Sequence, residues 1–129
     1  HWYVDLLLIS DSHADNAYAG TTGAEVLPFE NNSIEGSNSV LERDWNRYLE
    51  DVARANKLIC NIDLVTDNSL TTAERAQYKA EAKIFRAMVM FDMVRLWGDF
   101  PVITTVADDI TSENIDGIST IFPQTKYGT

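Results

Sequence analysis

The sequence predicts an all-α protein built around one antiparallel helical hairpin, with long loops on either side of it. Two stretches repeat apolar residues at steps of three and four, which is the spacing of one buried helix face. A short polar segment at residues 66–69 separates the two stretches and favours a turn. Long helices joined by so few residues pack side by side, so this hairpin is the expected core.

The first helix is expected at about residues 40–64. Ser39 followed by Glu42 fits a capping box, in which the serine side chain accepts from the amide of the third helical residue. The apolar face comprises Leu41, Trp45, Tyr48, Leu49, Val52, Ala55, Ile59 and Ile62. Cys60 is the only cysteine, and its apolar surroundings predict a small core residue.

The second helix is expected at residues 72–97. Thr71 and Glu74 form another capping box, Gly98 is suited to end the helix, and Pro101 prevents a restart. Residues 87–97 are apolar nearly all round, which predicts burial on all sides. The first helix offers only one face, so we expect a fragment of a larger helical-repeat scaffold.

The remaining segments give weaker patterns. Residues 2–9 are almost continuously apolar and fit either a buried strand or the end of a helix. Residues 10–38 are rich in Ser, Asp, Asn, Gly and Thr and predict a long loop. Residues 99–129 predict an irregular arm with short extended pieces such as 102–104.

The charge of the chain argues against a nucleic-acid partner. The formal net charge is −10, and residues 1–42 hold seven acidic residues and no Lys or Arg. Phosphate binding depends on Lys and Arg. No stretch approaches the roughly 20 apolar residues of a membrane span.

Several motifs resemble the SusD/RagB family. They are Ala80-Glu81-Ala82-Lys83-Ile84-Phe85-Arg86-Ala87, then Phe91, then Arg95-Leu96-Trp97-Gly98-Asp99-Phe100-Pro101. Trp45, Tyr48 and the Ala55-Asn56-Lys57-Leu58-Ile59 stretch are similar to the preceding family helix, and Asp109 to Ile115 is similar to its tail. The resemblance covers about residues 2–125, with Met90 as a small departure from the aromatic residue common there.

The resemblance implies a non-enzymatic, surface nutrient-binding component of a TonB-dependent uptake system in Bacteroidota. Such proteins bind an oligosaccharide or peptide, act as a lid on a SusC-like transporter, use no cofactor and are lipid-anchored to the outer membrane. Their scaffold consists of tetratricopeptide-like helix pairs, so this chain would be an interior part of the N-terminal half. Cys60 lies within a predicted helix and is not the lipid anchor.

The signature residues of the family are expected to be structural. These residues are Glu81, Phe85, Arg86, Phe91, Gly98 and Pro101. Phe85, Phe91 and Trp97 would fill a core, and the charged Glu81 and Arg86 would find partners on a mostly buried helix.

Ligand contacts are expected in the 10–38 loop. Aromatic rings stack on the apolar faces of sugars, and planar amides and carboxylates bind their hydroxyls. The loop supplies these types in Tyr18, Phe29, Asn16, Asn31, Asn32, Glu25 and Glu30. An ordinary surface loop with two anchoring aromatic residues is the competing interpretation.

Two other function classes compete with the nutrient-binding interpretation. Asp11 and His13 after an apolar run resemble the first motif of calcineurin-like, metal-dependent phosphoesterases, but the other motifs and further histidines are missing. A generic helical-repeat interaction module is the second alternative. No catalytic or metal-binding set emerges from the spacing of residues, so we expect no enzyme.

Overall fold

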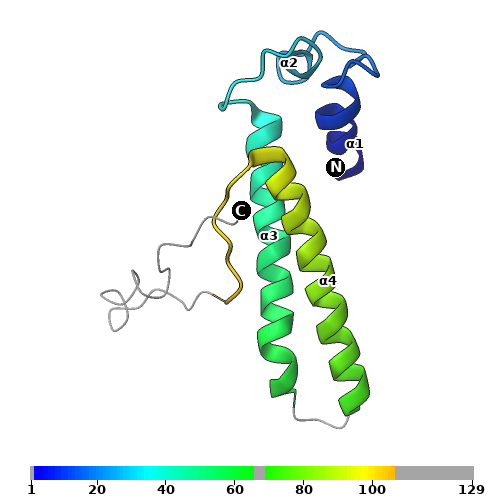
Figure 1. Ribbon diagram of the computed structural model, residues 1–129, viewed down its shortest axis with the longest axis vertical. Helices are drawn as coiled ribbons and strands as arrows, with labels where there is room; N and C mark the ends of the chain where they lie inside the picture. Colours follow the sequence, from blue (N-terminus) through cyan, green and yellow to red (C-terminus); the bar gives the residue numbers. More distant parts are fainter. Residues whose placement is uncertain (1, 66–68, 107–129) are drawn as a thin grey trace, which may run out of the picture. The chain divides into compact units, whose positions relative to one another are not determined.

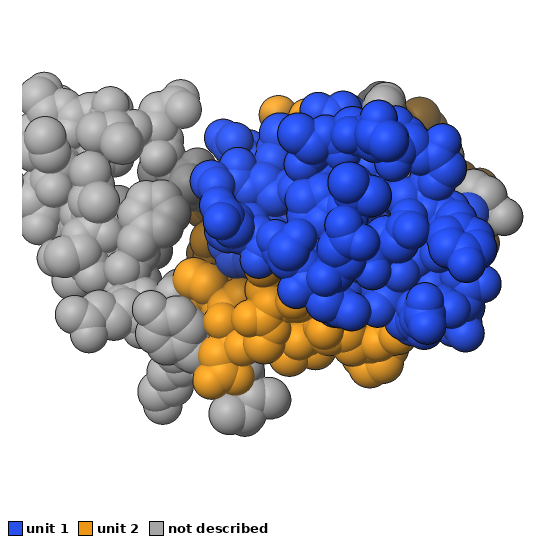
Figure 2. All heavy atoms as spheres, turned by 90° about the horizontal axis from the view of Figure 1, so that it is seen from above, with its two compact units in different colours: residues 1–47 blue, residues 48–129 orange. Residues whose placement is uncertain are grey.

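The computed structural model describes residues 2–65 and 69–106, with side chains described from residue 5 onward. The chain divides into two compact units, residues 1–47 and residues 48–129 (Figure 2). The boundary falls within the helix Ser39–Asn61. Each unit is described by itself.

Unit 1 begins with a helix. Helix α1 spans Trp2–Leu7 and continues as the π-helix η1, Leu8–Ser12 (Figure 1). The apolar run that fitted either a strand or a helix end is therefore helical.

The segment predicted as a continuous loop, 10–38, needs two corrections. Its first residues belong to η1, and it contains the short helix α2, Leu27–Glu30. Pro28 occupies the first turn of α2, where a proline loses no helical hydrogen bond. The ring of Phe29 is completely buried and anchors this turn.

Helix α3 spans Ser39–Asn61, so the predicted start is confirmed, but its cap is Asn38 and not Ser39. Oδ1 of Asn38 accepts a hydrogen bond from the Val40 amide at 2.9 Å, and the Asn38 carbonyl accepts from the Glu42 amide. Asparagine and serine are equally good N-caps, so the two neighbouring candidates could not be ranked by type.

Unit 2 holds the rest of α3, the 3₁₀ turn η2 at Ile62–Leu64, and helix α4, Thr72–Trp97. Helices α3 and α4 run antiparallel and side by side (Figure 1). The rings of Tyr48 and Trp97 meet edge to face with centroids 5.7 Å apart. The buried apolar residues of this unit are Tyr48, Val52, Ala55, Ile62, Ala82, Val89, Met93 and Phe100. The all-α prediction with a long helical pair is confirmed, and no strand occurs in the described ranges.

The ends of α4 follow the sequence prediction. Thr71 and Glu74 form the reciprocal capping box, and its hydrogen bonds hold the pKa of Glu74 below its usual value. Gly98 has φ +71°, a conformation that glycine adopts at little cost, and its amide bonds to the Val94 carbonyl.

Three predicted core residues are exposed instead. Phe85 and Phe91 are 42% and 60% exposed, because they lie on the face of α4 that α3 does not cover. Cys60 is also exposed, although its sequence neighbours are apolar.

Both charged signature residues of α4 have partners, as expected. Glu81 accepts a hydrogen bond from Gln77 at 2.8 Å. Arg86 donates to Oδ1 of Asn56 at 2.6 Å and to the Thr104 carbonyl at 3.2 Å. No helix among the described residues is both long and apolar enough to cross a bilayer.

Candidate functional site

Unit 1 contains a cavity of about 440 Å³ with both polar and apolar walls, lined mainly by exposed residues, which we call the loop cavity. It lies where the loop after α2 reaches the start of α3. Its lining residues are Ala24, Glu25, Pro28, Ser33, Glu35, Ser37, Asn38 and Ser39.

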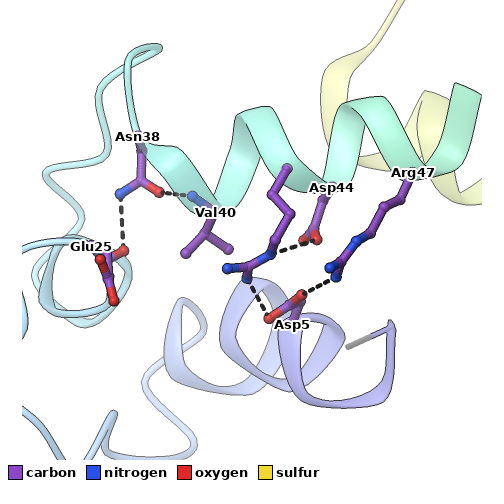
Figure 3. A network of polar contacts seen from close by, with 7 residues as sticks. Asp5, Glu25, Asn38, Val40, Asp44 and Arg47 are labelled. Atoms are coloured by element: carbon purple, nitrogen blue, oxygen red, sulfur yellow. Dashed lines mark hydrogen bonds and ion pairs between the residues drawn. The ribbon is translucent and has the colours of Figure 1, made fainter.

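Asn38 holds two walls of the loop cavity together. Its Nδ2 donates to the Glu25 carbonyl at 2.9 Å, while its Oδ1 caps α3 through Val40 (Figure 3). The backbone amide of Asn38 also donates to the Glu35 carbonyl at 3.0 Å. One side chain therefore ties the segment before α2 to the first turn of α3.

The floor of the loop cavity is fixed by α2. The Ser33 backbone amide donates to the Pro28 carbonyl at 3.0 Å, which ties two lining residues of the loop cavity together. Glu30 accepts from the Ala19 amide at 2.9 Å, so the carboxylate of Glu30 is used to hold the preceding loop.

The chemistry of the lining suits a hydroxyl-rich ligand. Three serine hydroxyls can each donate and accept, and the carboxylates of Glu25 and Glu35 accept. Sugars present hydroxyl donors and acceptors on every ring. A cavity of this size is in the range of small-ligand sites, of about 300–1,000 Å³.

The structure separates the residues predicted to bind ligand. Glu25 lines the loop cavity, whereas Asn16, Asn31 and Asn32 are exposed outside its lining. Tyr18 is 87% exposed, also outside the lining.

The prediction that Phe29 contacts a ligand needs correction, because its ring is fully buried and has no free face for a sugar. The residues that sequence reasoning missed are Ser33, Glu35, Ser37, Asn38 and Ser39. They gave one signal, a run of cap-forming side chains directly before the first long helix.

A buried charge cluster lies on the α1 side of the same unit. Asp5 of α1 and Asp44 of α3 are 4% and 5% exposed. Arg43 donates to Asp5 at 2.8 Å and lies 3.8 Å from Asp44, and Arg47 lies 3.9 Å from Asp5 (Figure 3). Burial, with the adjacent Asp5 carboxylate, raises the pKa of Asp44 to about 7.

Unit 2 has a second cavity of about 410 Å³ with mainly apolar walls, between α3 and residues 103–106. Val52 and Ile103 are among its lining residues. Such walls match a hydroxyl-rich ligand poorly, so the loop cavity is the better candidate for a sugar.

The Asp11 and His13 motif has a local role. His13 Nδ1 lies 3.3 Å from the Phe29 carbonyl, and the Asp11 carbonyl accepts from the amides of Asn16 and Ala17. Within the described ranges, no three His, Cys, Asp or Glu residues are grouped so that they could hold a metal ion.

Comparison with known proteins gives two matches. The model of the SusD-like family described as "Starch-binding associating with outer membrane" matches residues 8–121. A SusD-like protein of Bacteroides ovatus is 27% identical over 95 residues, which cover 74% of this chain and 16% of that protein. The chain therefore matches about a sixth of the length of this curated relative. No solved structure gives a significant match.

Proposed function

The chain belongs to the SusD-like family, and from this premise we propose that it is part of a non-enzymatic glycan-binding component of a SusC-type uptake system. The family match over residues 8–121 carries this proposal. Family members are generally binding proteins without catalytic activity. The family description supports a location at the outer membrane, where a TonB-dependent SusC-like transporter would be the partner.

Within this chain we propose the loop cavity as a glycan subsite. Its hydroxyl, amide and carboxylate lining supports this, as do the hydrogen bonds by which Asn38 connects its walls. Tyr18 remains a second candidate contact, because an aromatic ring so exposed is free to stack on a sugar.

Calorimetric titration of the complete protein with maltoheptaose tests the function, since the family description names starch. Ser37→Trp places a bulky side chain in the loop cavity and should weaken binding at least about tenfold, the loss of roughly one good contact. Glu42→Gln is the matched control, because Glu42 is exposed on the first turn of α3 outside the lining.

The two outcomes test the subsite and the function separately. Normal binding by Ser37→Trp would show that the loop cavity is not the subsite, and it would leave the proposed function standing. The proposed function would be overturned if the complete protein bound neither maltoheptaose nor any other sugar on a glycan array.

A further inference from the structure

We infer that the loop cavity selects oligosaccharides without negative charge, so that it accepts neutral or amine-bearing sugars and rejects those carrying uronate or sulfate. This inference rests on the proposed glycan-binding function and adds the class of ligand.

The lining offers an anionic group no partner. Two of its eight residues, Glu25 and Glu35, are acidic, and its lining contains no lysine, arginine or histidine. A carboxylate or sulfate entering the cavity would meet like charge, without the charged donor that normally binds such a group. A neutral hydroxyl meets acceptors and donors there, and an amine meets two carboxylates.

Asn38 reduces the attraction of the nearby helix terminus for anions. The start of a helix normally attracts anions through its free amides. Here Oδ1 of Asn38 occupies one of these amides, that of Val40, and the Glu42 amide makes the first intrahelical bond to the Asn38 carbonyl. The donating Nδ2 of Asn38 is also committed, to the Glu25 carbonyl.

The wider charge of unit 1 acts in the same direction. Residues 1–47 hold eight acidic side chains against two arginines, which leaves a formal charge of −6. Both arginines lie outside the cavity lining and pair with the buried Asp5 or Asp44. At physiological salt this field extends over about one Debye length, roughly 8 Å, which spans a sugar ring.

The test compares maltoheptaose with its 6-O-sulfated and 6-amino-6-deoxy derivatives on the complete protein, at 50 mM and 500 mM NaCl. An array of neutral, amine-bearing, uronate-bearing and sulfated oligosaccharides widens the search beyond one backbone. Glu25→Gln with Glu35→Gln removes both negative charges of the lining, and Glu42→Gln removes one negative charge outside it.

We expect the sulfated probe to bind at least about tenfold more weakly than maltoheptaose at low salt, because like charges at contact distance repel most when salt does not screen them. High salt and the double variant should each shrink this gap, while Glu42→Gln should change it little. Equal or tighter binding of anionic sugars by the wild-type protein, or a gap unchanged in the double variant, would overturn the inference and leave glycan binding standing. Absence of binding to every sugar would instead overturn the proposed function, and the inference with it.

Discussion

Arg86 on α4 and the buried Asn56 on α3 form a polar pair that holds the chain after the hairpin. Nη1 of Arg86 donates to Oδ1 of Asn56 at 2.6 Å, and Asn56 is only 1% exposed. Nδ2 of Asn56 in turn donates to the Ile103 carbonyl at 2.9 Å. Both residues belong to the family motifs, and this pairing gives those motifs a physical role.

Asn56→Ala should therefore lower the free energy of unfolding by about 1–3 kcal/mol, since it removes the hydrogen bonds that the buried Asn56 amide makes with Arg86 and with the Ile103 carbonyl. Denaturant titration measures the loss, and faster hydrogen exchange at residues 103–105 would localise it. Arg54→Ala is the control, because Arg54 pairs with Glu50 at the surface and such pairs contribute about 0.5 kcal/mol or less. Equal losses in the two variants would contradict a special role for Asn56.

The buried Asp44 should make stability depend on pH. Its pKa is raised from 3.8 to about 7 in the folded chain, chiefly by burial. Between these values the folded state holds a proton that the unfolded state has lost. The contribution of Asp44 is therefore favourable at low pH and declines as pH rises from about 4 to 7.

Asp44→Asn keeps the shape and removes the titration. The stability of this variant relative to wild type should rise with pH across that window, by up to about 1.4 kcal/mol per pH unit for one proton. Unfolding titrations at pH 4, 5, 6, 7 and 8 measure the difference. A difference that stays flat across these pH values for Asp44→Asn would refute the raised pKa of Asp44.

Two aromatic residues of the loop should behave in opposite ways. Phe29→Ala should cost about 3–5 kcal/mol of folding stability, since it empties a fully buried site. Tyr18→Ala should change stability by less than about 0.5 kcal/mol, because its ring is in solvent. Thermal and denaturant unfolding of both variants check this, and a large loss in Tyr18→Ala would show that its ring packs on the fold.

The hairpin was predictable because its signals are local. The Thr71 capping box, Gly98 and the apolar spacing each act within a few residues along the chain. The loop cavity was not predictable, since it depends on Asn38 bonding across 13 residues to Glu25. Composition alone could not separate the buried Phe29 from the exposed Tyr18, because both are aromatic residues in a polar segment.

Helix α4 has an exposed apolar face. Four side chains spaced along one side of the helix are between 42% and 71% exposed: Ile84, Phe85, Met88 and Phe91. The Arg95 guanidinium lies 5.5 Å from the ring centre of Phe91. Contiguous apolar surface of this kind promotes association.

The 129-residue chain on its own should therefore self-associate at micromolar to millimolar concentration, as exposed apolar faces do. Replacing Ile84 and Phe91 by serine should shift sedimentation toward monomer, with little loss of stability, because neither side chain is buried. Leu64→Ser is the control, since Leu64 is 70% exposed but lies in η2, away from this face. If the wild-type chain stays monomeric across this range, the exposed face of α4 does not drive association. A strong effect of Leu64→Ser would show that the chains associate through a surface other than this face.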